Sequence, residues 1–151
     1  MNYLFDPIRK KEIVFQPEED VRQNLLHWMI RDLGYPREFL CVEVDLRTLP
    51  HLYDIRMKLP KRRADIICYG KNIVPTFELY PLLMIECKAV NLTSKALDQV
   101  KGYNHYVNAF FIAVANSKEI KSFWYNSKDK KYESINFLPS YEQLIEAVKT
   151  I

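Results

Sequence analysis

The sequence lacks any apolar run long enough to cross a bilayer. A membrane-spanning helix needs about 20 consecutive apolar residues, and no stretch of this chain approaches that length. The N-terminus also lacks the basic-then-apolar layout of a signal peptide. We therefore expect a cytoplasmic protein with no membrane partner.

Cysteine is scarce and follows no pattern. Cys41, Cys68 and Cys87 are the three cysteines, and each lies inside an apolar run that predicts a strand. An odd number at scattered spacings fits neither a disulfide framework nor a zinc site. We expect buried free thiols.

Two kinds of catalytic motif are missing as well. There is no Gly-rich phosphate-binding loop. The three histidines, His27, His51 and His105, are dispersed, and no Ser/His/Asp or Cys/His arrangement is evident. The chain therefore gives no sign of a nucleotide-driven motor or of a nucleophilic triad.

What is present indicates one globular domain. The chain has 151 residues, of which 48% are hydrophobic and 27% charged, as in ordinary soluble proteins. We find no internal repeat and no low-complexity segment. We expect a single domain over 1–151, with a core at about 17–120 and a closing hairpin and helix at 121–151.

The apolar periodicity predicts an α/β fold. A first helix is expected from Pro17 to Leu33, followed by the stop signals Gly34 and Pro36. The other expected elements are strands at 39–46, 64–69, 82–88 and 109–115, a helix from Thr93 or Ser94 to 107, a hairpin at 122–126 and 132–137, and a helix capped by Ser140. We expect a short edge strand at 12–15, a loop or irregular hairpin at 47–61 and a turn at 70–78. This order predicts a central mixed sheet with helices on both faces.

Asp65 and the pair Glu86 and Lys88 carry the chemistry. Glu86 and Lys88 lie two apart on one predicted strand and so share a face. Two carboxylates that converge repel each other unless a cation joins them, and oxygen ligands suit Mg²⁺ or Mn²⁺. The carbonyl of Cys87 is a further candidate ligand. A lysine beside such a metal can orient the attacking water.

This spacing alone also occurs on solvated strand edges. Two details favour a site. Glu86 and Lys88 directly follow the apolar run 82–85, and buried charge is costly unless it is paired or metal-bound. A basic cluster, Lys61, Arg62 and Arg63 with Lys58, precedes Asp65 and suits a phosphate backbone.

Several blocks resemble one known family, the N-terminal domain of type I restriction-enzyme R subunits. They are the run 17–23, Gly34-Tyr35-Pro36, Val42-Glu43, the run 62–67, the run 83–89, and Gln99 followed by Tyr103-Asn104. They appear in the family's order over roughly residues 6–120. The resemblance implies a restriction-endonuclease-like PD-(D/E)XK fold and Mg²⁺-dependent cleavage of DNA.

The resemblance also implies roles for individual residues. Asp65 and Glu86 would be metal ligands and Lys88 the catalytic lysine. Glu18 or Glu19 would complete the acidic cluster, and we prefer Glu18 because it shares the helix face of Arg22 and Leu25.

Two further residues of the resemblance lie on the second predicted helix. Gln99 and Tyr103, four apart on one helix face, would orient a ligand, Lys88 or a phosphate. For Tyr103, simple packing between helix and sheet is the alternative.

The chain departs from the family in two respects. The family's Thr-Asn-Gly is Ala115-Asn116-Ser117 here, and residues 1–151 contain no translocase. We therefore expect a nuclease domain that acts on DNA, with a motor or specificity subunit on another chain. The alternative is a non-cleaving module of the same fold that binds DNA or a protein partner.

Overall fold

The computed structural model describes residues 2–150, and its centre is a six-stranded sheet. The strand order is β3-β4-β5-β6-β7-β8, in which only the β5–β6 pair is parallel. The strands are β3 (Leu40–Asp45), β4 (Arg63–Val74), β5 (Phe77–Cys87), β6 (Phe111–Ala115), β7 (Ile120–Asn126) and β8 (Lys131–Ile135). The sheet is therefore mixed, as predicted.

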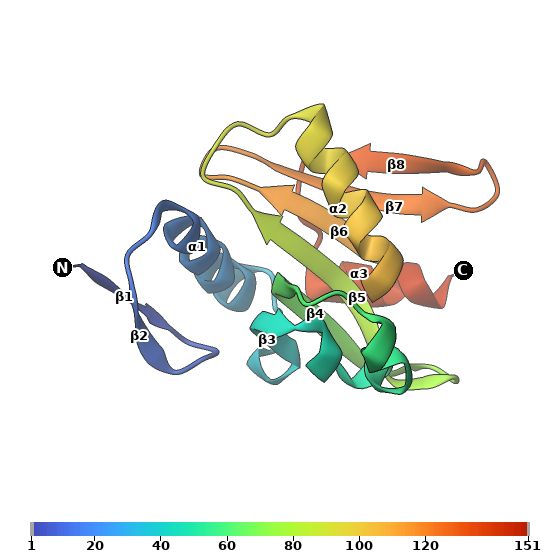
Figure 1. The fold of residues 1–151 in the computed structure, drawn as a ribbon. Coiled ribbons are helices and arrows are strands. Elements are labelled where there is room, and N and C mark those ends of the chain that lie inside the picture. Colours follow the sequence, from blue (N-terminus) through green and yellow to red (C-terminus); the bar gives the residue numbers. More distant parts are fainter. Residues whose placement is uncertain (1, 151) are drawn as a thin grey trace.

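Helices cover both faces of this sheet, and each face has its own apolar core (Figure 1). One core is closed by α1 (Pro17–Asp32) and α3 (Tyr141–Lys149), through residues such as Leu26, Met29 and Leu144. The other is closed by α2 (Ser94–Val107) together with the short 3-10 helices η2 (Leu46–Thr48) and η3 (Pro50–Lys58). The predicted α/β class is confirmed.

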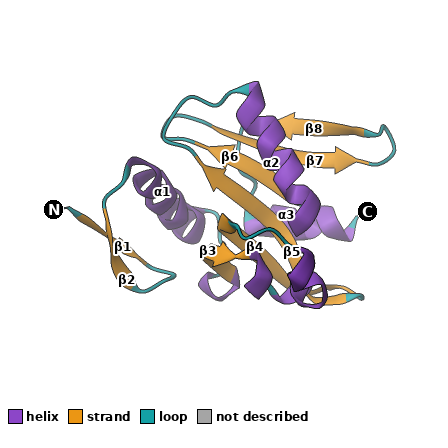
Figure 2. Cartoon of the chain, in the orientation of Figure 1, coloured by secondary structure: helices purple, strands orange, loops and turns teal. Residues whose placement is uncertain are grey.

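A separate two-stranded hairpin precedes α1. Strands β1 (Tyr3–Asp6) and β2 (Lys11–Val14) pair antiparallel with each other and not with the central sheet. In Figure 2 this hairpin lies beside α1, away from the other strands. The expected edge strand at 12–15 is thus half of a hairpin that packs on a helix.

The predicted boundaries differ most in the β4–β5 hairpin. These strands continue to Val74 and from Phe77, so only 75–76 remain for the turn that we expected at 70–78. Exposed residues such as Lys71 and Glu78 interrupt the apolar residues there, so a search for apolar runs misses these parts of the strands. The expected loop at 47–61 contains η2 and η3. A third 3-10 turn, η1 (Arg37–Phe39), leads into β3.

The caps of the last two helices follow the sequence signals. The Thr93 hydroxyl accepts from the Ala96 amide, and Ser140 forms a capping box with Gln143. Among the described residues, no helix has both the length and the apolar content to cross a membrane.

Candidate functional site

Asp65 and Glu86 lie on adjacent strands, where β4 and β5 separate. The last paired residues of this ladder are Ile66 and Ile85, so Asp65 and Glu86 come next on the two strands. Beyond that point the Cys87 amide donates to Asp65 Oδ2 at 2.8 Å instead of to a backbone carbonyl. The side chain of Asp65 therefore completes the ladder, and the predicted adjacency of the two acids is confirmed.

A local irregularity turns Asp65 toward α1. In the β3–β4 ladder the pair Glu43–Asp65 is skipped, and Glu43 has a φ of 54°, in the left-handed region. Ala64 and Ile66 are two residues apart yet pack in different cores, so the alternation of β4 is broken at Asp65. A left-handed non-glycine residue costs about 1–2 kcal/mol. Irregularities of this kind re-aim side chains beside functional sites.

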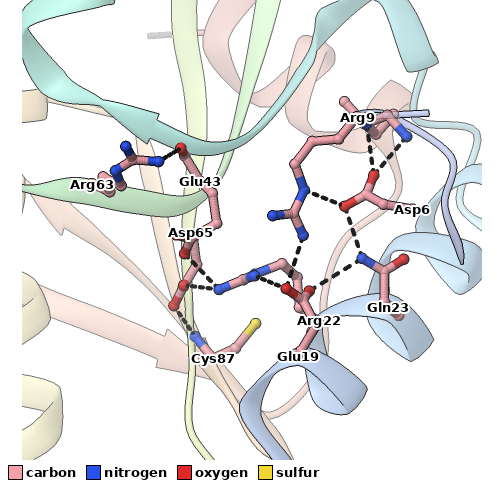
Figure 3. Close-up of polar contacts among 10 residues, drawn as sticks. Asp6, Arg9, Glu19, Arg22, Gln23, Glu43, Arg63, Asp65 and Cys87 are labelled. Atoms are coloured by element: carbon pink, nitrogen blue, oxygen red, sulfur yellow. Dashed lines mark hydrogen bonds and ion pairs between the residues drawn. The ribbon is translucent and has the colours of Figure 1, made fainter. Parts of the chain in front are cut away.

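Arg22 of α1 gathers three carboxylates at this point (Figure 3). Its guanidinium donates to Glu19 Oε1 at 2.8 Å, to Glu43 Oε1 at 2.6 Å and to Asp65 Oδ1 at 2.6 Å. Arg22 is only 5% exposed, so these ion pairs are shielded from water. Sequence reasoning placed Arg22 on the inward face of this helix but gave no role to it or to Glu43, because their contact joins segments that are far apart in the sequence.

The pKa values of the two acids shift in opposite directions. Burial alone would raise the pKa of Asp65, but Glu86, the Cys87 amide and Arg22 together hold it below its usual value. Burial and the charge of Asp65 raise the pKa of Glu86 to about 9, against the opposing charges of Lys88 and Arg62. Glu86 Oε1 is buried and has no hydrogen-bond partner among the described residues. Glu86 therefore holds its proton more tightly than Asp65 does.

The cationic side of the site is formed by Lys88 and Arg62. Both residues lie close enough to Glu86 that their charges oppose the rise of its pKa. Lys88 is partly exposed, and its backbone amide donates to the carbonyl of Ala115 on β6 at 2.8 Å. The guanidinium of Arg62 is exposed and lies 4.0 Å from the centre of the Tyr103 ring. A cationic edge thus borders the acidic pair.

The two residues predicted on α2 differ in burial: Tyr103 is buried and Gln99 is exposed. Tyr103 is buried under Arg62, and its hydroxyl has no hydrogen-bond partner within residues 2–150. Burial and the charge of Glu86 raise the pKa of that hydroxyl. Its ring is therefore covered rather than open to a nucleic-acid base. Gln99, one turn earlier, is exposed.

Helix α1 corrects the preference for Glu18. Glu18 is exposed, whereas Glu19 is 7% exposed and binds Arg22 and Arg9. The helical-face argument failed because α1 turns Glu19, and not Glu18, toward Arg22 and toward Arg9 of the β1–β2 hairpin. Glu18 still lies near enough for its charge to affect the Cys87 thiol.

The remaining predicted residues lie at the entrance to β4. Lys61 and Arg63 are exposed, and Arg63 donates to the backbone carbonyl of Glu43 at 3.3 Å. Arg63 therefore touches the irregular residue of β3 rather than the acidic pair itself.

The donor set suits a hard cation only in part. Within residues 2–150, no group of three or more Asp, Glu, His or Cys side chains is arranged to hold a metal ion. The Cys87 thiol is buried in the core, and burial raises its pKa well above the usual value. The unpartnered Glu86 oxygen beside Asp65 nevertheless fits Mg²⁺, which takes one or two carboxylates and keeps several waters.

A comparison with known families found a match over most of the chain. The family model described as type I restriction enzyme R protein N terminus matches residues 17–139. The site is thus part of an α/β domain from a restriction-modification system. The chain belongs to this family of R-protein N-terminal domains. No curated protein and no solved structure matched the chain. The matched range contains α1 and the Asp65–Glu86 pair, whereas the β1–β2 hairpin lies outside it.

Proposed function

We propose that this domain hydrolyses phosphodiester bonds of DNA with Mg²⁺ or Mn²⁺ as its cofactor. The observation that carries the proposal is the convergence of Asp65, Glu86 and Lys88 where β4 and β5 separate. The family match supports a restriction context, and we propose DNA as the substrate, with a motor or specificity subunit on another chain as the partner.

The residues divide the chemistry among them. Asp65, Glu86 and the Cys87 carbonyl would hold the cation, which would polarise the scissile phosphate and lower the pKa of a bound water. Lys88 would orient the attacking water and offset the negative charge that grows on the phosphate. The Cys87 amide fixes the Asp65 carboxylate in place.

Tyr103 and Gln99 have supporting roles in this proposal. Tyr103 carries Arg62 on its ring and so holds this guanidinium beside the acidic pair. Arg62 can then approach a phosphate of the DNA backbone as a planar donor. Gln99 is exposed on the same helix and is free to hydrogen-bond a bound strand.

Metal binding tests the proposal directly and should depend on pH. Because the pKa of Glu86 is raised to about 9, the carboxyl must lose a proton before it can hold a cation. We expect Mg²⁺ affinity to rise between pH 6 and 8.5, approaching tenfold per pH unit for one linked proton. Calorimetry in buffers of different ionisation enthalpy would measure the affinity and the released proton together.

Two variants sharpen this experiment. Asp65→Ala should lose Mg²⁺ binding, and Glu86→Gln should bind weakly without the pH dependence, because the amide does not titrate there. Asp98→Ala, which removes an exposed acid of α2, is the matched control and should behave as wild type. Wild-type affinity that stays constant across this pH range would contradict the assignment of Glu86 as a ligand.

The basic edge predicts how the domain holds DNA. Arg62→Ala with Arg63→Ala should weaken duplex binding and reduce the slope of log affinity against log salt by about 2, one for each lost phosphate contact. Fluorescence anisotropy in EDTA measures binding without cleavage. Lys128→Ala with Lys130→Ala, in the β7–β8 turn, is the control with the same charge change. A salt slope unchanged by the arginine substitutions would place the DNA elsewhere.

A further inference from the structure

Arg22 contacts the same carboxylate that we assign to the cation. Its Nη2 atom lies 2.6 Å from Asp65 Oδ1 and also 2.6 Å from Glu43 Oε1, and its Nη1 atom lies 2.8 Å from Glu19 Oε1 (Figure 3). A guanidinium and a divalent ion cannot both lie close to Oδ1, because like charges repel strongly at such distances. Filling of the site therefore requires a change at Arg22.

The other oxygen of Asp65 is held separately. Asp65 Oδ2 accepts from the Cys87 amide at 2.8 Å, and this contact fixes the plane of the carboxylate. Because Cys87 is buried at the end of β5, we treat its amide as a fixed donor. Oδ1 is therefore the oxygen whose partner can be exchanged.

Arg22 remains paired if it loses Asp65. Its contacts with Glu19 and Glu43 are both independent of Oδ1. Glu19 is itself fixed by Arg9 at 2.9 Å and by the Gln23 amide at 3.2 Å. A buried guanidinium without a counter-charge would be very costly, but here two carboxylates remain. The exchange thus needs no movement of α1.

We propose that Arg22 is the internal counter-ion of the metal-free site, and that a divalent ion displaces it from Asp65 Oδ1 while it stays bound to Glu19 and Glu43. This inference rests on the proposed function, because it assumes that the cation binds at Asp65. Arg22 is a positioning residue here: it keeps Asp65 in place before the cation arrives and weakens the binding of that cation. The irregular backbone at Glu43 supports this arrangement by bringing a second carboxylate to the same Nη2 atom.

Substitution of Arg22 separates this role from a purely structural one. Arg22→Met keeps most of the buried volume and removes the competing charge, so we expect Mg²⁺ affinity to rise by about tenfold or more. Thermal stability in EDTA should fall, because three carboxylates lose their partner, and Mg²⁺ should restore more of it than in wild type. A merely structural arginine would give lower affinity together with lower stability.

Two further variants serve as references. Arg22→Lys keeps the charge on a single ammonium that cannot contact all three carboxylates, so its Mg²⁺ affinity should lie between those of Arg22→Met and wild type. Arg31→Met, which removes an exposed arginine of the same helix, should leave Mg²⁺ affinity unchanged. A folded Arg22→Met protein that binds Mg²⁺ no more tightly than wild type overturns the inference.

A measurement on the wild-type protein covers the case in which Arg22→Met does not fold. The side-chain Nε–H resonance of Arg22 in ¹H–¹⁵N spectra should shift and saturate in parallel with Mg²⁺ binding, whereas that of Arg31 should not move. If calorimetry detects Mg²⁺ binding that Asp65→Ala abolishes, yet the Arg22 resonance stays fixed, only the exchange is wrong. If wild type and Asp65→Ala both fail to bind Mg²⁺, the proposed function fails and the exchange with it.

Discussion

Lys88→Ala is expected to reduce DNA cleavage by about 10²–10³-fold, in the range found when one charge-stabilising donor is removed from an active site. Lys88 acts on charge that develops in the transition state, so its loss should lower the cleavage rate and largely spare Mg²⁺ affinity. Glu86→Ala should lose both, because Glu86 is assigned to hold the cation. Gel assays on plasmid and linear DNA with Mg²⁺ or Mn²⁺, without ATP, measure the rate, and calorimetry measures binding.

The control for this experiment is Lys95→Ala. Lys95 is an exposed lysine in the first turn of α2, so its removal changes the net charge equally without touching the acidic pair. Cleavage that survives in Lys88→Ala would indicate a contaminating nuclease or another site. Wild-type protein that binds DNA with the expected salt slope but cuts with no divalent ion would favour the non-cleaving module.

The sequence predicted the order of the elements because the apolar periodicity of the buried parts is strong. The 16 residues of α1 were recognised from that periodicity together with Pro17, Gly34 and Pro36, and the buried half of β5 from its apolar run. The extensions of β4 and β5 were not recognised, because exposed residues such as Lys71 and Glu78 interrupt their apolar residues. Of the β1–β2 hairpin only β2 was predicted, as an edge strand, because the hairpin packs on a helix and not on the sheet.

For the site, the order of the strands was enough to predict that Asp65 and Glu86 lie on adjacent strands, because Asp65 comes early on one strand and Glu86 directly follows the buried run of the next. It could not predict Arg22, whose three partners come from two strands and one helix. The left-handed conformation of Glu43 likewise accompanies a skipped pair in the β3–β4 ladder, and no local sequence pattern predicts it. Contacts that depend on tertiary geometry were therefore the ones missed.

Glu18 and Glu19 illustrate the same limit within one helix. Helical geometry gives the angle between two side chains, but it does not give the number of faces that a helix buries. Helix α1 packs on the sheet and also on the β1–β2 hairpin, so both neighbouring faces are partly covered. The choice between the two glutamates depended on a hairpin whose packing the sequence did not indicate.

The β1–β2 hairpin leads to the last prediction, which concerns Asp6. This carboxylate is fully buried and accepts from the Ile8 and Arg9 amides, from Arg9 Nε at 2.7 Å and from the Gln23 amide at 2.8 Å. Its removal leaves the Ile8 and Arg9 amides without their acceptor, and a buried group left unpaired costs about 1–3 kcal/mol, whereas Arg9 keeps Glu19 as its counter-charge. Asp6→Ala should therefore lower the free energy of unfolding by about 3 kcal/mol, as measured by urea denaturation at pH 7.

The pH dependence gives this prediction a sign. Burial alone would raise the pKa of Asp6, but its hydrogen bonds with Arg9, Gln23 and the Ile8 amide hold this pKa below its usual value. The stability from Asp6 is thus complete above the unfolded pKa and is lost as pH falls through the lower folded value. The difference between wild type and Asp6→Ala should consequently shrink in acid.

Asp32→Ala is the matched control, because Asp32 forms an exposed ion pair with Arg31 at 3.2 Å. Exposed pairs contribute about 0–1 kcal/mol, so this variant should unfold almost as wild type does. Because Arg9 links Asp6 to Glu19, and Glu19 holds Arg22, Asp6→Ala should also loosen the support of Arg22. An Asp6→Ala protein as stable as Asp32→Ala would mean that the hairpin is an appendage and no part of the fold that supports the site.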